Sequence, residues 1–161
     1  MGQLWVYAGM KEGKQVTFFP FYGAEKRGGI ARAGVIVSTE EIASPLVTRP
    51  DSAVVMNLDS LPLCENILKE GGTLLINSSL VKVDSKRKDV KVIKVPANEL
   101  AEKIGDVKFA NMVMLGALAA ATGAVKLDKM EAILKSFFAP NKHKFIPLNL
   151  QALDAGAKSV G

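Results

Sequence analysis

Two short apolar runs separated by a helical segment constrain this chain more than any other feature. The first run is A-V-V-M-N-L at 53–58, and the second, at 73–77, follows the turn-forming pair Gly71-Gly72. Runs of this length are typical of strands covered on both faces. Two of them joined through a helix form a parallel βαβ unit. The pattern therefore predicts an α/β fold with a single open, mostly parallel sheet and helices on both faces.

The rest of the chain continues this alternation without a linker, so we expect one domain over residues 1–161. The first predicted helix has no strand before it, which indicates that the chain is truncated at its N-terminus or that its first strand comes from elsewhere. Strands are predicted at 15–21, 29–38 and 89–95. Helices are predicted at 3–12, from about 58 to 69, from 97 to 104, and at 109–122, 126–138 and 151–158.

Composition excludes several classes of protein. With 161 residues and 48% apolar residues, the chain can bury a core of its own, unlike a disordered tail. The single cysteine, Cys64, and the single histidine, His143, exclude an internal disulfide, a zinc cage and an iron–sulfur cluster, so no metal site is predicted. No export signal is present, and the apolar segment 109–125 is too short to span a membrane. We therefore expect a cytoplasmic protein without a membrane partner.

The net charge of +5 is concentrated in the lysine-rich segment 81–94. No aromatic residue interrupts this segment, so it offers no platform on which bases could stack. Lysines at a sheet edge also protect it from pairing with other chains. We interpret the segment as a solvated turn between two strands, and no nucleic-acid partner is expected.

The most unusual segment is Y-G-A-E-K-R-G-G at 22–29. Its glycines permit close approach by a ligand or another chain, and Arg27 carries a planar fork suited to carboxylate or phosphate. A segment that leaves a strand can lie at the sheet edge where open α/β folds bind ligands. A solvated hairpin turn is the alternative interpretation. The phosphate-loop, dinucleotide-fingerprint, nucleophile-elbow and H-E-x-x-H motifs are all absent.

This segment and its surroundings resemble the gamma subunit of 2-oxoacid:ferredoxin oxidoreductases. The family pattern is close to E-G-x-x-V-T-x-x-P-S-Y-G-P-E-x-R-G-G followed by a V-I-x-S strand. The likeness continues through I-A-S-P-L-V, R-P-D, N-M-V-M-L-G-A-L and P-L-N-L-Q-A-L-D-A-G, and so covers nearly the whole chain. Tyr22, Glu25 and Gly29 match the 2-oxoglutarate or branched-chain 2-oxoacid type better than the pyruvate type.

The resemblance implies a Rossmann-like subunit of a heteromeric enzyme. That enzyme oxidatively decarboxylates a 2-oxoacid with coenzyme A, giving acyl-CoA, carbon dioxide and reduced ferredoxin. Thiamine diphosphate, Mg²⁺ and 4Fe-4S clusters are implied on the alpha, beta and delta-type partner subunits, with coenzyme A as co-substrate and ferredoxin as acceptor. This chain would have no catalytic residue of its own. It would contribute a subunit interface and part of the coenzyme A path.

Within this interpretation, Lys26 and Arg27 contact an anion or a partner, and Glu25 holds Arg27. Tyr22 wedges the bend, and the small residues beside the charged ones permit close approach. The candidate contact residues are Tyr22, Gly23, Glu25, Lys26, Arg27, Gly28 and Gly29, with Ser44, Asn57 and Asn111 as supporting residues.

The sequence departs from the family pattern in two places. Phe21 and Ala24 replace a serine and a proline, and the opening strand with its glycine-rich loop is missing. Two other hypotheses remain open at this point: a stand-alone α/β module that binds a nucleotide or phosphorylated ligand, and a decayed, non-functional fragment.

Overall fold

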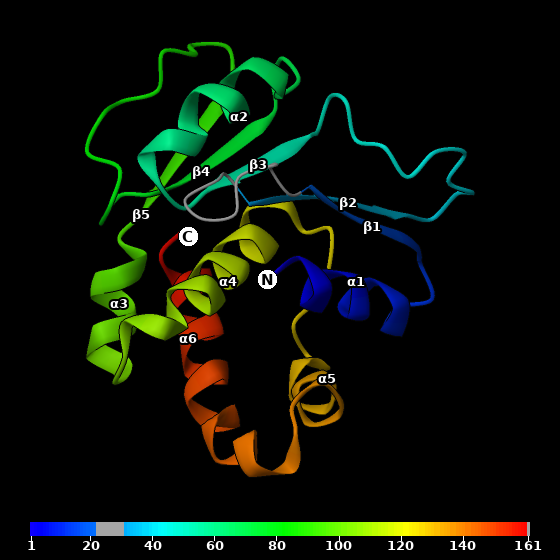
Figure 1. Ribbon diagram of the computed structural model, residues 1–161, viewed down its shortest axis with the longest axis vertical. Helices are drawn as coiled ribbons and strands as arrows, with labels where there is room; N and C mark the ends of the chain where they lie inside the picture. Colours follow the sequence, from blue (N-terminus) through cyan, green and yellow to red (C-terminus); the bar gives the residue numbers. More distant parts are fainter. Residues whose placement is uncertain (22–30, 161) are drawn as a thin grey trace.

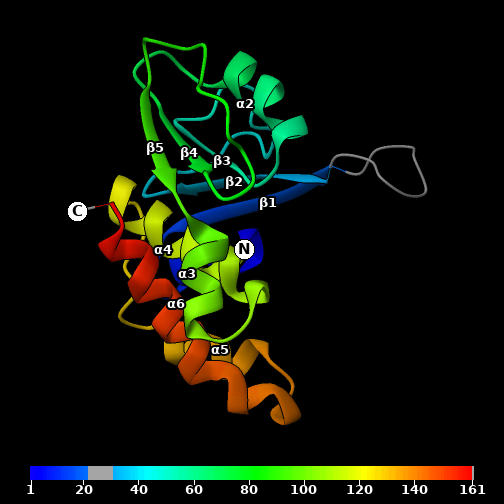
Figure 2. The same ribbon diagram turned by 90° about the vertical axis from the view of Figure 1, so that its left-hand side faces the viewer.

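The computed structural model describes residues 1–21 and 31–160, which form an α/β fold (Figures 1 and 2). Its strands are β1 (Gln15–Phe21), β2 (Arg32–Ser38), β3 (Ser52–Val55), β4 (Thr73–Asn77) and β5 (Lys91–Val95). Its α-helices are α1 (Gly2–Lys11), α2 (Leu61–Ile67), α3 (Ala97–Ile104), α4 (Ala110–Thr122), α5 (Met130–Phe137) and α6 (Ile146–Lys158). Three short 3₁₀ helices are η1 (Leu58–Ser60), η2 (Val107–Phe109) and η3 (Pro140–Phe145).

The parallel sheet has the order β3-β4-β5 and is covered on both faces, as predicted. Alternate side chains of β4 point to opposite faces because successive residues of a strand do. Leu74 and Ile76 pack with α2 in one core cluster, whereas Leu75 belongs to the larger cluster formed with α1, α4 and α6. The central strand is therefore buried on both sides, and the βαβ unit expected from residues 53–77 is confirmed.

The prediction of a single sheet is wrong for the described residues. Strands β1 and β2 form a separate antiparallel pair, in register from Gln15 opposite Ser38 to Phe21 opposite Arg32. Within residues 1–21 and 31–160, β2 is paired to β1 alone and β3 to β4 alone. The hairpin passes close to β3 in both views without joining its sheet (Figures 1 and 2). Sequence patterns identify strands, but they do not specify which strands become neighbours.

Helices α4 and α6 form the tightest contact in the larger core. A methyl group on Gly116 would collide with the carbonyl of Leu153, and one on Gly156 would collide with the carbonyl of Val113. Both glycines are therefore required for the backbones to approach this closely. The long buried helix predicted at 109–122 is confirmed, and Gly123 ends it with a left-handed φ of 62°.

The basic segment 81–94 contains most of the loop between β4 and β5, and lysines lie on the edge strand β5, as expected. The loop is more firmly anchored than a free turn would be. The Glu65 carboxylate accepts hydrogen bonds from Ser85 Oγ at 2.6 Å and from the Lys86 N–H at 2.7 Å. Arg87 donates to the backbone carbonyls of Glu65 and Leu68 at the end of α2.

Candidate functional site

The residues with the most specific sequence pattern, 22–29, lie outside the described part of the chain. They comprise Tyr22, Gly23, Glu25, Lys26, Arg27, Gly28 and Gly29, so their assignment remains a prediction. The structure describes the strand ends from which this segment leaves and to which it returns. Phe21 and Arg32 lie opposite each other in the ladder, and the Arg32 guanidinium carbon is 4.3 Å from the centre of the Phe21 ring. This cation–π contact holds the base of the segment together.

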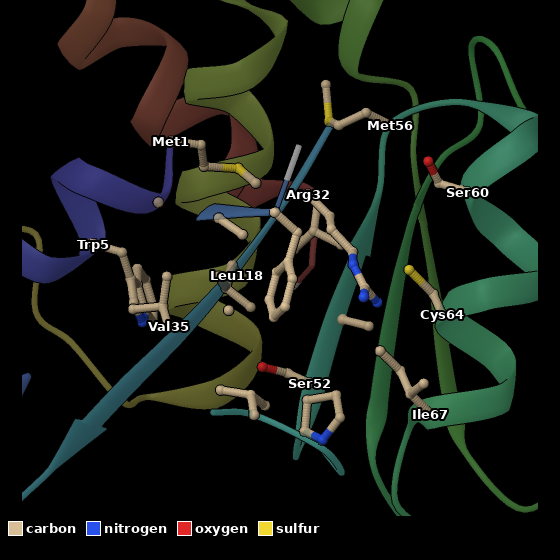
Figure 3. A pocket seen from close by; sticks show the side chains of 18 of the residues that line it. Met1, Trp5, Arg32, Val35, Ser52, Met56, Ser60, Cys64, Ile67 and Leu118 are labelled. Carbon is tan, nitrogen blue, oxygen red and sulfur yellow. The ribbon is translucent and has the colours of Figure 1, made fainter. Parts of the chain in front are cut away.

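A pocket of about 300 Å³ lies beside this base, between β2 and β3 (Figure 3). We call it the β2–β3 slot. Its two edges are formed by consecutive residues of the strands, 31–35 and 52–54. Trp5 of α1 and Leu118 of α4 line one side, and Cys64 and Ile67 of α2 line another. The slot is therefore bounded by two strand edges and by helices from both layers of the fold.

Among the described residues that line the slot, the charged side chain is Arg32, which extends toward Cys64 on α2 (Figure 3). Burial raises the pKa of the Cys64 thiol, and the positive charge of Arg32 opposes this effect only in part. A thiol with a raised pKa stays protonated at neutral pH, so it is a weak nucleophile and a poor metal ligand. The slot is thus suited to binding an apolar group with one acceptor or negative charge, rather than to covalent catalysis.

The three supporting residues have different surroundings. Ser44 is exposed, and its hydroxyl accepts a hydrogen bond from the Leu46 N–H at 3.3 Å. Asn57 follows β3 and caps η1, where its side chain accepts from Ser60 N at 3.1 Å and from Ser60 Oγ at 2.6 Å. Ser60 in turn lines the slot, so Asn57 shapes its rim from outside.

Asn111 lies instead at a second cavity, of about 660 Å³, among the helices. Phe137 and Phe145 contribute its exposed aromatic lining, and its charged lining is Lys142 and the ion pair between Lys108 and Asp106. This cavity extends from α1 to α6, and Met1 lines both it and the slot. Asn111 lines this second cavity, whereas Phe21 and Arg32 at the base of the 22–29 segment line the slot.

Two further observations concern metal binding and membrane spanning. Across residues 1–21 and 31–160, no three His, Cys, Asp or Glu side chains gather closely enough to hold a metal ion. None of the described helices is both long and apolar enough to cross a bilayer.

Sequence reasoning missed the proximity of Arg32 and Cys64. They come from a strand and a helix with no characteristic spacing between them, and only the three-dimensional fold brings them to one slot. The signal available in the sequence was Arg32, a charged residue at the start of an apolar strand.

Comparison with known proteins identifies the family. A family model described as pyruvate ferredoxin/flavodoxin oxidoreductase matches residues 1–159. The chain belongs to this family. This confirms the resemblance that the motifs indicated, and the oxidoreductase family match extends over both the hairpin and the parallel sheet.

The relatives include proteins of very different length. Ketoisovalerate oxidoreductase subunit VorA of Methanothermobacter thermautotrophicus is 37% identical over 161 residues, which cover 98% of this chain and 33% of VorA. The 2-oxoglutarate synthase subunit KorC of Methanothermobacter marburgensis is 34% identical over 173 residues, covering 99% of this chain and 91% of KorC. This oxidoreductase-family chain thus spans about a third of VorA but nearly all of KorC.

A solved structure shows the same fold. The gamma subunit of a keto/oxoacid ferredoxin oxidoreductase from Geobacter sulfurreducens PCA superimposes with a TM-score of 0.81 at 28% identity. The match covers 99% of this chain and 88% of that subunit.

Proposed function

We propose that this chain is the gamma-type subunit of a 2-oxoacid:ferredoxin oxidoreductase that acts on 2-oxoglutarate or a branched-chain 2-oxoacid. The complex converts the 2-oxoacid and coenzyme A to acyl-CoA and carbon dioxide, and ferredoxin takes up the two electrons. The observation that carries this proposal is the match to the family over residues 1–159, together with the likeness to KorC along 91% of its length.

The donor set of this chain does not fit the redox cofactors of such a complex. A 4Fe-4S cluster needs four thiolates, and the chain has one cysteine, whose thiol pKa is raised. We therefore assign the clusters, thiamine diphosphate and Mg²⁺ to the alpha, beta and delta-type subunits. The role left to this chain is to bind and position rather than to carry electrons.

We assign that role to the segment 22–29, with Arg27 as the main contact to an anion or to a partner subunit. The described base of the segment supports this assignment. The hydrogen-bonded ladder joins β1 to β2 from the Gln15–Ser38 pair to the Phe21–Arg32 pair. The contact between Arg32 and Phe21 fixes the strand ends. A guanidinium presented from such a base suits bidentate recognition of the phosphates of coenzyme A or of a partner carboxylate. Glu25 holds Arg27, and Ser44, Asn57 and Asn111 remain proposed supporting residues.

The test is the variant Arg27→Ala in the reconstituted complex. Loss of a charge-assisted hydrogen bond costs about 1.5–3 kcal/mol, so we expect about a tenfold or larger rise in KM for coenzyme A, or a comparable loss of subunit affinity. Arg27→Lys keeps the charge but loses the planar fork and is the matched control. If Arg27→Ala leaves both assembly and KM for coenzyme A unchanged, Arg27 has neither role.

A further inference from the structure

One face of the β1–β2 hairpin has a gap in its row of side chains, directly beside the base of segment 22–29. Phe19 pairs with Gly34 across the ladder, and the next pair on the same face joins Phe21 to Arg32. The two phenylalanine rings lie 4.9 Å apart, and the Arg32 guanidinium covers the Phe21 ring. Gly34 is thus the one position of these two pairs without a side chain.

Val47 occupies this gap. A methyl group on Gly34 would lie 3.2 Å from Val47 Cγ2, 3.3 Å from Val47 Cβ and 3.7 Å from Phe21 Cε2. Glycine therefore lets the valine and the Phe21 ring approach the same point of the β2 backbone. Val47 is half-buried, whereas Leu46 and Thr48 on either side of it are exposed. The contact is made by one side chain of a stretch that is otherwise turned to solvent.

The segment that carries Val47 is held on both sides of it. The described residues 39–51 connect β2 to β3 without forming a helix or a strand. Before the valine, the Ser44 hydroxyl accepts a hydrogen bond from the Leu46 N–H, which fixes a local turn. After it, the Pro50 carbonyl accepts from the Lys69 N–H at 3.1 Å, at the end of α2. Connections of this length are uncommon in compact domains and usually have a function.

We propose that Val47 is a positioning residue for the contact made by segment 22–29. Seated over Gly34, it holds the Phe21 ring against Arg32 and fixes the direction in which the two strand ends present the segment. Among residues 1–21 and 31–160, the hairpin has no ladder to the parallel sheet, so contacts with its two faces set its orientation. Helix α1 covers one face, and Val47 packs on the other (Figure 1). The proposal rests on the proposed function.

The first test replaces Val47 in the reconstituted complex. Val47→Ala removes both Cγ atoms and leaves the gap partly empty. We expect a rise of about threefold or more in the KM for coenzyme A or in the dissociation constant of the subunit, whichever Arg27→Ala raises, with kcat and Tm little changed. Val47→Ile keeps the branched Cβ and should restore the wild-type value. Leu46→Ala is the matched control, because this exposed neighbour should change neither quantity.

A double variant separates positioning from a general loss of stability. If Val47 acts through the contact of Arg27, adding Val47→Ala to Arg27→Ala should raise KM or the dissociation constant no further, because the oriented contact is already lost. Equal rises in the wild-type and Arg27→Ala backgrounds would overturn the proposal.

Amide hydrogen exchange in the free chain tests the contact without the complex. In Val47→Ala, the amides of residues 32–35 should exchange about fivefold faster or more, while those of the buried helix α4 keep their rates. Unchanged exchange in 32–35 would overturn the proposal.

The two proposals fail in different ways. A loss of function in Arg27→Ala with none in Val47→Ala would overturn the role of Val47 and leave the proposed function standing. No effect of Arg27→Ala on assembly or on KM would contradict the proposed function of segment 22–29 and, with it, this proposal.

Discussion

Replacing Gly156 by alanine tests the packing that supports the whole larger core. The added methyl carbon would lie 2.7 Å from the carbonyl carbon of Val113, and closer still to its oxygen, and 3.0 Å from the Ala117 nitrogen. These are backbone atoms of α4, so no side chain can rotate away. Helices α4 and α6 would have to separate by roughly 1.5 Å to restore ordinary contact distances.

Two opposing effects determine how much Gly156→Ala changes the free energy of unfolding. Alanine is favoured over glycine inside a helix by about 1 kcal/mol. Overpacking costs about 1–3 kcal/mol or more, and a collision with backbone belongs at the upper end. We therefore expect a net loss of about 2 kcal/mol or more in the free energy of unfolding, which corresponds to a fall in Tm of about 4–8 °C.

Thermal and urea denaturation followed by circular dichroism measure this loss. The exposed Gln151 on the same helix provides the control, because Gln151→Ala should change the stability little. A second check comes from Gly116→Ala. One separation of the helices relieves both collisions, so the double variant should lose less stability than the two single losses together. A Gly156→Ala chain as stable as the wild type would refute the reasoning.

Further predictions concern buried polar groups and titration. Asn77 is fully buried and its side-chain oxygen accepts from Ser79 N at 3.2 Å, so Asn77→Ala should cost about 1–3 kcal/mol of unfolding free energy in urea titrations; a change within error would contradict this. A hydrogen bond from Lys14 lowers the pKa of Glu12, so this contact stabilises the fold above the usual glutamate pKa and is lost as the pH falls through the lowered folded-state pKa. Glu12→Gln should therefore flatten the acid side of the stability–pH curve, and an unchanged curve would refute the contact's contribution. Because burial raises the pKa of Cys64, its alkylation rate should reach half-maximum above the usual thiol value of about pH 8.5, and a midpoint at or below that value would contradict the assignment.

Helices and strands were predictable where particular residues, such as glycines, determine the local backbone conformation. The strand Thr73–Asn77 follows a glycine turn, and the helix that ends at Gly123 carries its own left-handed cap. Helix α6 was predicted too short, as 151–158. It begins at Ile146 because Pro147 occupies its first turn, where a proline needs no N–H partner.

Helix α5 was predicted too long, from 126. It begins at Met130, because the N–H of Lys126 donates to the Glu12 carboxylate at 2.5 Å, at the far end of α1. Such a tertiary contact cannot be read from helical periodicity.

For the same reason, the sequence could not predict how the strands pair or which residues line the slot. The residue composition of 29–38 and the short apolar run at 53–58 identify β2 and β3, but they contain no information on the gap between the two strand edges. The slot unites Arg32 of β2 with Cys64 of α2, two residues far apart in the sequence. By contrast, the family could be inferred from segment 22–29, because its tyrosine, glycines and charged residues stand in the same order as in the family pattern.

The most direct test of the central claim compares amide hydrogen exchange of segment 22–29 in the free chain and in the assembled oxidoreductase complex. If this segment contacts the partner subunits, its exchange slows markedly on assembly, and Arg27→Ala reduces that protection. Equal exchange rates in the free and assembled states would contradict a docking role for the segment.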